Sequence, residues 1–558
     1  MLNNLVKKYI SVVKNICKKD DPTIITYGSN VLGDKKADLD VCIIVKNSKN
    51  YVKEIVGKSK SFFEKEGLML DQEIPYENKL VYSYEEVDEI LSDNIFINEL
   101  GEFCVLDIIK SKEFLSSQHM HERLLLNILT TLHKVVMGDE LYVSLCEKRA
   151  WEIIIEAVTY YFGLPYDTKP EKYMNILHKN PKTQSEGEWY LGYKSDAGMK
   201  DRYLLNKLKE YLPLFRAKKI NLAENINPYY PSISMQRKIF DMYEKILKYP
   251  ENKDISLREK LSNIYGINMT NVIMTNGAME AIQIVVNGAV KNNVAIIQPT
   301  FWGYEDRLRK LEKCYTNLWA EQDDLKIVLE MACARYDYVF LCNPNNPCYR
   351  YVSKTFIKSL LKRFDKCTLV IDESLLAFEN NYMDMTLIKE TVEHRNLIVL
   401  MSFSKISSFC GLRVGFIAAN KEILSKLECY RAPYASGALG QRIFNEFGYK
   451  ILYDTQNRSK IRKNFLFLEK KFSEYNKYKV EICGNAYILF EMTEEFNVTE
   501  LCVYLHENNI EVRNLVNAYP QINRNCIRIS AGKQSDFIRL QQKIDEYLWR
   551  NNSEQSDC

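Results

Sequence analysis

The sequence has no run of about eighteen consecutive apolar residues, the length that a membrane-spanning helix requires. The opening segment MLNNLVKKYISVVKNICKKDD places apolar and basic residues at helical spacing and lacks the uninterrupted apolar stretch and small-residue cleavage site of a secretory signal. The fifteen cysteines are scattered singly, without the paired spacing of a zinc site or a small disulfide framework. We therefore expect a cytoplasmic protein with reduced thiols and no membrane partner.

A large excess of one charge is also missing. The chain has 76 basic and 73 acidic residues, which leaves a formal charge of only +3. A protein that binds nucleic acid or a membrane surface usually carries a larger basic excess, so small-molecule partners are favoured. At 558 residues the chain is too long for one hydrophobic core, and we expect two or three domains.

Three regions differ in their residue pattern. In residues 1–112, helical segments mix with short β-rich runs such as ITYGSN and LDVCIIV, which predicts a small α/β domain. In residues 113–216, runs such as HERLLLNILTTLHKVV carry apolar residues at spacings of three and four, which predicts a helical subdomain and a linker. In residues 217–550, apolar runs alternate with helical patterns, which is typical of βα units around a mostly parallel sheet. Residues 551–558 are predicted to be a disordered polar tail.

The N-terminal region contains a Gly-Ser turn followed by two paired carboxylates. Gly28 and Ser29 end one predicted strand, and Asp38-Leu39-Asp40 opens the next. Side chains alternate along a strand, so both carboxylates point to one face, where their repulsion favours a bound cation. Oxygen ligands suit Mg²⁺ with a nucleotide's phosphates, and the Gly-Ser turn can donate to those phosphates. The alternative is that Asp38 and Asp40 are solvated acids at a strand edge.

This pattern resembles the nucleotidyltransferase superfamily of DNA polymerase β, over roughly residues 20–110. The resemblance implies a third metal-binding carboxylate on a later strand, for which Asp71 is the first choice and Asp107 the rival. It also implies Mg²⁺-dependent nucleotidyl transfer from an NTP, either ATP or CTP, onto a small molecule.

The segment SFSKISSFCGLRVGF in the C-terminal region combines a lysine with groups that can hold a phosphate. Lys405 offers an amine that can join covalently to an aldehyde, while Ser402, Ser404 and Arg413 offer hydroxyls and a cation, and Gly411 permits a tight turn. The arrangement resembles the Ser-x-Ser-Lys and Gly-Leu-Arg-x-Gly motif of fold-type I aminotransferases. It is most similar to the branch of histidinol-phosphate aminotransferase and threonine-phosphate decarboxylase, and it implies pyridoxal 5′-phosphate (PLP) as cofactor.

Further segments follow in the order of that family. Free N–H groups of the helix that begins at Gly277, Ala278 and Met279 favour a phosphate. The resemblance implies that Phe301 stacks on the cofactor ring, that Asn346 bonds its phenolic oxygen, and that Asp372 keeps its pyridine nitrogen protonated.

The resemblance also implies a homodimer, because the tyrosine at the position of Tyr229 reaches the phosphate of the partner subunit in this family. Arg513 and Arg528 are placed where the family holds a substrate carboxylate or phosphate. The implied architecture is a large domain at about 250–440 and a small α/β domain made of 217–249 with 441–550.

Two departures bear on the reaction. Cys348-Tyr349 stands where the family has Thr-Gly, and Leu375 stands where histidinol-phosphate aminotransferases have a tyrosine. The first hypothesis is a bifunctional biosynthetic enzyme that transaminates an amino compound bearing a second anionic group and also transfers a nucleotidyl group. The second is a decarboxylase of a phospho-amino acid. In the third, the N-terminal module is a regulatory nucleotide-binding or antibiotic-modifying domain.

Overall fold

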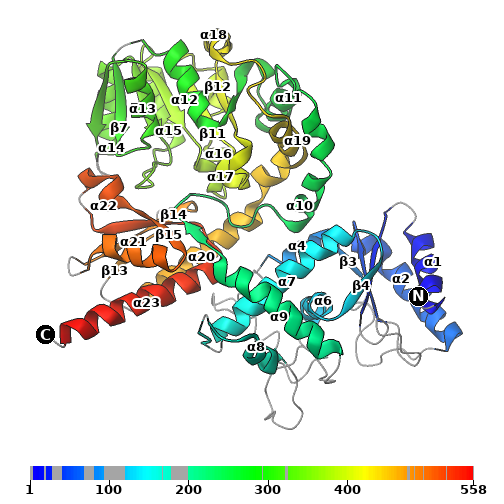
Figure 1. Ribbon diagram of the computed structural model, residues 1–558. Helices are drawn as coiled ribbons and strands as arrows, with labels where there is room; N and C mark the ends of the chain where they lie inside the picture. The colour runs from blue at the N-terminus through cyan, green and yellow to red at the C-terminus, as the bar shows by residue number, and fades with distance from the viewer. Residues whose placement is uncertain are drawn as a thin grey trace. The chain divides into compact units, whose positions relative to one another are not determined.

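The computed structural model describes most of the chain, as residues 4–17, 20–27, 40–67, 81–92, 120–161, 163–165, 167–177, 199–291, 293–320, 324–473, 478–482, 484–493, 496–522 and 524–556. The chain divides into two compact units (Figure 1). The first unit consists of Met1–Lys218 with Ser232–Lys238, and the second of Lys219–Pro231 with Ile239–Cys558.

The first unit contains a four-stranded sheet in the order β3-β2-β1-β4. The strands are β1 (Thr23–Tyr27), β2 (Val41–Val45), β3 (Val81–Ser83) and β4 (His133–Met137). Strand β1 is antiparallel to β2 and β4, and β2 is parallel to β3. Ile24 belongs to the apolar core under α1 and α2, while its neighbour Ile25 belongs to the core shared with α7. Because both faces of the sheet are covered, β1 and β2 are buried along their whole length.

Helices form the rest of the first unit. Their bounds are α1 (Asn4–Ile16), α2 (Ser48–Glu66), α4 (Tyr84–Ile90), α6 (Met120–Thr130), α7 (Glu140–Tyr161), α8 (Pro170–Leu177) and α9 (Met199–Ala217), with α10 (Ile233–Phe240) beginning in this unit. Trp151 of α7 is fully buried and stacks on Tyr211 of α9 at 6.0 Å.

The structure corrects one prediction for this region. The run HERLLLNILTTLHKVV does not form one helix, because α6 ends at Thr130 and β4 follows at His133–Met137. The β-branched pair Val135-Val136 favours a strand, and pairing with β1 provides the partner. Gly138 then ends the strand at φ +97°, a backbone conformation that favours glycine.

The second unit contains a seven-stranded sheet in the order β6-β12-β11-β10-β9-β7-β8. The strands are β6 (Val272–Asn276), β7 (Val294–Gln298), β8 (Tyr315–Trp319), β9 (Tyr338–Cys342), β10 (Thr368–Asp372), β11 (Leu397–Ser402) and β12 (Val414–Ala419). All neighbours are parallel except for β12, which is antiparallel to both β11 and β6. The sheet confirms the mostly parallel α/β fold predicted for this region.

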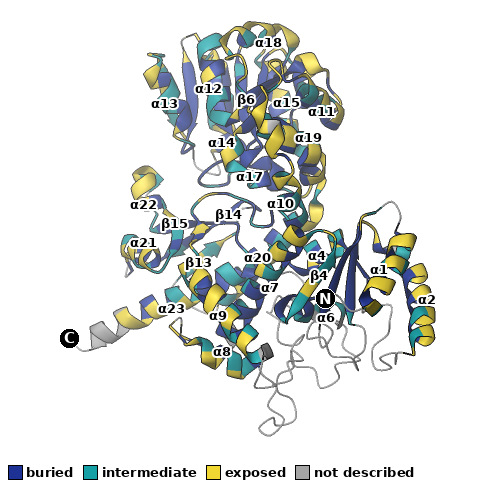
Figure 2. Ribbon diagram, turned by 45° about the vertical axis from the view of Figure 1, so that its right-hand side comes forward, coloured by how far each residue is buried: buried dark blue, intermediate teal, exposed yellow. Residues whose placement is uncertain are grey.

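Helices cover the seven-stranded sheet. They are α11 (Ile255–Tyr265), α12 (Gly277–Gly288), α13 (Gly303–Lys310), α14 (Leu325–Arg335), α15 (Lys354–Arg363), α16 (Tyr382–Met385), α17 (Ser404–Ser407) and α18 (Lys421–Leu427). Figure 2 shows dark blue strands between helices whose outer faces are exposed.

A five-stranded sheet in the order β13-β14-β16-β15-β5 completes the second unit. Its strands are β5 (Ile220–Leu222), β13 (Tyr478–Glu481), β14 (Tyr487–Met492), β15 (Ile510–Asn514) and β16 (Cys526–Ser530). The remaining helices are α19 (Ala438–Tyr453), α20 (Thr455–Ser473), α21 (Val498–Glu507), α22 (Leu515–Ala518) and α23 (Gln534–Ser556). Among the residues that the structure describes, no helix has the length and apolarity needed to span a bilayer.

Candidate active site

The C-terminal residues of β-strands in the seven-stranded sheet bring the predicted site residues together. Strand β10 ends at Asp372, and its parallel neighbour β11 ends at Ser402, three residues before Lys405. On its other side, Cys342 of β9 pairs with Asp372 and leads into the loop that carries Asn346. Ligands of α/β sheets bind at the carboxyl ends of the strands, so this edge is the natural place for a site.

Lys405 lies in the one-turn helix α17 that follows β11. Its side chain is partly buried, and desolvation lowers the pKa of the amine despite the opposing charge of Asp372. The Lys405 backbone oxygen accepts a hydrogen bond from Asn227 N at 3.0 Å, and the Asn227 side chain donates to Ile406 O at 3.1 Å. The segment around Asn227 therefore fixes the position of α17.

Asp372 is buried and its two carboxylate oxygens have separate donors. Oδ1 accepts from Ser374 N at 2.9 Å, and Oδ2 accepts from the Tyr304 hydroxyl at 2.7 Å. Burial and the Asp372 charge raise the pKa of Tyr304 well above its usual value, so this hydroxyl is a donor. Sequence reasoning did not include Tyr304. The available signal was its place three residues after Phe301, as the second residue of α13.

A candidate cradle for a phosphate lies where α12 begins, at Gly277. Gly277 has φ +76°, and a Cβ added there would overlap the Arg413 guanidinium. Arg413 Nη1 donates to Ser404 Oγ at 3.5 Å and to Cys410 O at 3.1 Å. The structure thus brings Gly277, Ser404 and Arg413 together, and the φ of +76° favours glycine at position 277.

The remaining cradle residues are close by in the fold. Ala278 and Met279 follow Gly277 in the first turn of α12 and are half-buried. Ser402 is buried at the end of β11, and its N–H donates to Ser374 Oγ at 3.1 Å. Gly411 lies in the exposed turn before Arg413.

Phe301 lies on the loop after β7 and is half-buried. Its ring meets the Tyr304 ring edge to face, with centroids 5.7 Å apart and an interplanar angle of 82°. Tyr304 therefore contacts both Phe301 and Asp372. Trp302 points elsewhere and is 55% exposed.

The predicted substrate arginines are neighbours across two strands. Arg513 of β15 and Arg528 of β16 are paired residues, and Arg513 is exposed while Arg528 is 6% exposed. Arg528 donates to Asn346 Oδ1 and to Ala223 O, and its guanidinium lies 5.2 Å from the centroid of the Tyr487 ring. Burial, with a smaller contribution from Arg513, lowers the pKa of Arg528. Two adjacent guanidiniums favour an anion between them.

Tyr229 is not part of this cluster. It is buried within the second unit, and its hydroxyl accepts a hydrogen bond from Asn464 Nδ2 at 2.6 Å. Its contact with the cofactor of a partner subunit stays a prediction. Leu375, at the position of the family's tyrosine, is buried and offers no hydroxyl to a cofactor.

Most of the predicted nucleotidyltransferase site cannot be located. Gly28, Ser29, Asp38, Asp71 and Asp107 all lie outside the described residues. Asp40 is described, directly before β2, and its backbone oxygen accepts from Tyr27 N at 3.2 Å. The end of β1 that leads into Gly28 therefore lies beside Asp40.

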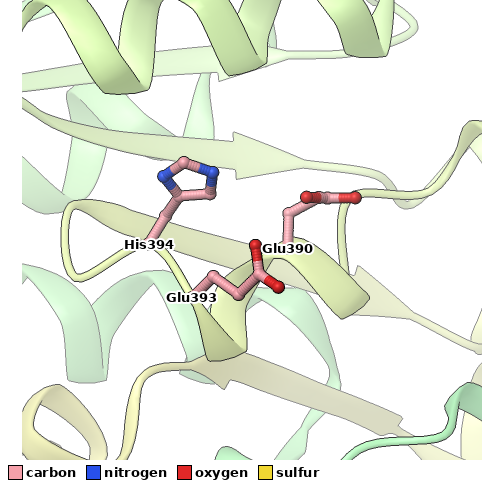
Figure 3. A group of neighbouring side chains, drawn as sticks. All are labelled: Glu390, Glu393 and His394. Atoms are coloured by element: carbon pink, nitrogen blue, oxygen red, sulfur yellow. The ribbon is translucent and has the colours of Figure 1, made fainter.

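A trio of potential metal ligands lies elsewhere in the second unit, at Glu390, Glu393 and His394 (Figure 3). Glu390 is paired with Lys354 at 3.4 Å and with Lys358 at 2.8 Å. These lysines lower the pKa of Glu390 and balance its charge, so ion pairs account for the group without a metal.

Comparisons with known proteins agree with this geometry. Residues 217–544 match the profile of the family "Aminotransferase class I and II". The chain is 26% identical to histidinol-phosphate aminotransferase of Methanocaldococcus jannaschii over 388 residues, which cover 65% of this chain and 100% of that protein. It is 29% identical to the enzyme of the same name from Geobacillus sp. strain WCH70 over 342 residues, covering 59% of this chain and 90% of the relative.

Among solved structures, the L-threonine-O-3-phosphate decarboxylase of Porphyromonas gingivalis superposes with a TM-score of 0.52 at 22% identity, covering 59% of this chain and 99% of that chain. The histidinol-phosphate aminotransferase of Clostridium acetobutylicum gives a TM-score of 0.51 at 19% identity, with the same coverage of both chains. At this identity the two structures establish the shared fold.

Proposed function

The chain belongs to the aminotransferase class I and II family of PLP-dependent enzymes, and we propose that it transaminates an amino compound that bears a second anionic group. The observation that carries this proposal is the position of the Lys405 amine at the end of β11, beside the end of β10 with its buried carboxylate Asp372. The guanidiniums of Arg528 and Arg513 supply the anion-binding part of the same unit.

The residues present fit PLP. The cradle of Gly277, Ser404 and Arg413 would hold its phosphate, because a side chain at Gly277 would fill the space beside the guanidinium. Asp372, held by Ser374 and Tyr304, would keep a positive charge on the pyridine nitrogen. When bound, the cofactor supplies an electron sink for the bond broken at the substrate α-carbon.

The chain's own residues then bind the substrate and move a proton. Arg528 and Arg513 orient the substrate through its anionic group. The lowered pKa of Lys405 leaves more of its amine neutral, so that Nζ can accept the proton from the substrate α-carbon and release it again as a general acid. Lys405 is the proposed catalytic base, and Asp372 is the second catalytic residue.

A decarboxylase of a phospho-amino acid is the alternative reaction, and the absence of a hydroxyl at Leu375 is the observation that keeps it open. The test incubates the full-length, PLP-loaded protein with L-histidinol phosphate plus keto-acid acceptors, and separately with L-threonine O-3-phosphate. Transamination predicts amino-acid formation from the acceptor without CO₂. Release of CO₂ without amino-group transfer would replace the first proposal by the second.

For the N-terminal unit we propose Mg²⁺-dependent nucleotidyl transfer from ATP or CTP onto a small molecule, in a bifunctional biosynthetic enzyme. The support is that Asp40, directly before β2, lies beside Tyr27, the last residue of β1, whose N–H donates to Asp40 O at 3.2 Å. Asp38, Asp40 and Asp71 are the proposed metal ligands. Full-length protein should release pyrophosphate from one of the nucleotides when Mg²⁺ and an acceptor are present, and Asp40→Asn should remove that release while transamination continues. A regulatory role for this unit predicts that it binds a nucleotide without releasing pyrophosphate.

A homodimer is part of the proposal. Large apolar side chains that are strongly exposed cluster along one segment of the second unit, namely Phe240, Tyr243, Leu247 and Tyr249. The Tyr249 ring lies 5.4 Å from that of Tyr434, which is also exposed. Contiguous exposed apolar surface commonly marks an interface, and light scattering of the purified protein tests for twice the mass of one chain.

A further inference from the structure

Tyr349 occupies a backbone position that normally requires glycine. It stands where the resembling family has glycine after Asn-Pro-Thr, and its φ is +53°. A left-handed conformation is unfavourable for a residue with a side chain, because Cβ comes too close to the following carbonyl oxygen. The loop therefore holds a tyrosine in a strained backbone conformation, which persists only where the surrounding contacts support it.

The Tyr349 side chain fits closely into its surroundings and is only 8% exposed. Its hydroxyl donates to the Glu379 carboxylate, and its ring meets the Tyr487 ring at 5.3 Å and 80°. On the other side the ring lies against Gly484, where an added Cβ would overlap its carbon atoms. The ring thus joins the loop after β9 to the start of β14.

Tyr487 connects this contact to the site. Its hydroxyl accepts from Tyr349 N at 2.7 Å and donates to Asn345 O at 2.6 Å. Arg528 lies on β16, the strand paired with β14, and its guanidinium lies over the Tyr487 ring, 5.2 Å from the centroid. The Arg528 guanidinium donates to Asn346 Oδ1 and to Ala223 O, and its Nε has no hydrogen-bond partner among the described residues. The Tyr487 face is therefore a third contact that orients the guanidinium.

We propose that Tyr349 is a positioning residue that holds Tyr487 beneath Arg528 and thereby orients the guanidinium that binds the substrate's anionic group. The inference rests on the proposed function, because substrate binding by Arg528 is itself part of that proposal. Glycine in the same turn would leave Tyr487 without its edge-to-face partner, and the cation–π contact below Arg528 would lose its support.

The test uses variants of the full-length, PLP-loaded protein. Tyr349→Asn keeps a residue that tolerates the left-handed conformation and removes the ring. Gly484→Ala keeps the tyrosine at position 349, but its added methyl group overlaps the Tyr349 ring and displaces it. Tyr349→Phe removes the hydroxyl and keeps the ring contacts. Tyr351→Phe is the matched control, because it removes a hydroxyl from another, half-buried tyrosine of the same loop.

The readout that needs no turnover is the rate at which phenylglyoxal modifies Arg528, measured by peptide mass spectrometry relative to Arg395, whose side chain is 75% exposed. We expect Tyr349→Asn and Gly484→Ala each to raise this relative rate by about tenfold. A guanidinium that is held less firmly spends more time exposed to the reagent, and the rate of modification follows that exposed fraction. Tyr349→Phe and Tyr351→Phe should retain the wild-type rate. With a substrate identified, KM should rise about tenfold while kcat is largely kept, because the lost interaction is one of substrate binding.

An unchanged Arg528 rate in both Tyr349→Asn and Gly484→Ala would overturn the proposal. If one of the two variants fails to fold, as judged by circular dichroism, the other still decides the question. If the rates rise as expected and no anionic amino compound is turned over by the wild type, the proposed function fails and the positioning role of Tyr349 stands.

Discussion

Replacing Tyr304 by phenylalanine removes one hydroxyl, and that hydroxyl donates to Asp372 Oδ2 at 2.7 Å. Both residues are buried, with Tyr304 1% and Asp372 5% exposed, so water does not readily replace the lost donor. A hydrogen bond to a charged group contributes about 1.5–3 kcal/mol. If the bond is needed to hold Asp372 toward the cofactor, kcat/KM should fall about tenfold to a hundredfold. The fall should be in kcat, because Arg528 and Arg513 still bind the substrate.

The variant keeps the aromatic ring and its edge-to-face contact with Phe301, so the fold should be retained. The matched control is Tyr265→Phe, which removes a hydroxyl from a buried tyrosine pair, 2.7 Å from the Tyr382 hydroxyl. Steady-state kinetics and the absorbance of the bound cofactor are measured for both variants. We expect near wild-type kcat for Tyr265→Phe. A PLP-loaded Tyr304→Phe enzyme with wild-type kcat would refute the role given to this hydrogen bond.

Three further predictions follow from the site and its surroundings. Lys405→Ala should abolish turnover. It should also abolish the permanent attachment of PLP that borohydride reduction produces, which mass spectrometry detects. Gly277→Ala should weaken PLP binding at least about tenfold, measured by titration, because its methyl group meets Arg413 and its φ is +76°. Burial raises the pKa of Glu373 from 4.5 to about 7, so its contribution to stability is fully present below pH 4.5 and is lost as the pH rises through 7. At 1.36 kcal/mol per pH unit, the free energy of unfolding should fall by about 3 kcal/mol over this range. The free energy of unfolding, measured with urea at pH 5 and pH 8, should therefore differ less between the two pH values in Glu373→Gln than in the wild type.

The C-terminal part of the site was largely predictable because its residues lie at strand ends that the sequence marks clearly. Asp372 closes the apolar run of β10, and Lys405 follows that of β11, so a parallel sheet must bring the two segments to one edge. Tyr304 escaped prediction because a tyrosine in the first turn of a helix looks like a core residue. Its bond to Asp372 depends on how α13 packs on the sheet, which no local pattern specifies.

The conformation of Tyr349 also depends on a contact that local sequence does not reveal. This tyrosine stands where the family has glycine, and the structure gives it a φ of +53° and accommodates its side chain against Gly484, which lies far away in the sequence. In the N-terminal unit, β1 and β2 were predicted from their apolar runs, but β4 was assigned to a helix. Its apolar residues satisfied helical spacing, and only the pairing with β1 distinguishes the two.

The charges around the proposed substrate site indicate what kind of anion it takes. Neither Arg528 nor Arg513 forms an ion pair with a carboxylate of the described residues, although the two are paired across β15 and β16. In the proposed function a bound anion would relieve the repulsion between the two guanidiniums, and an anion with two negative charges would relieve it more than one with a single charge. A phosphate-bearing amine should consequently bind more tightly than its unphosphorylated counterpart, and the preference should weaken as the salt concentration increases.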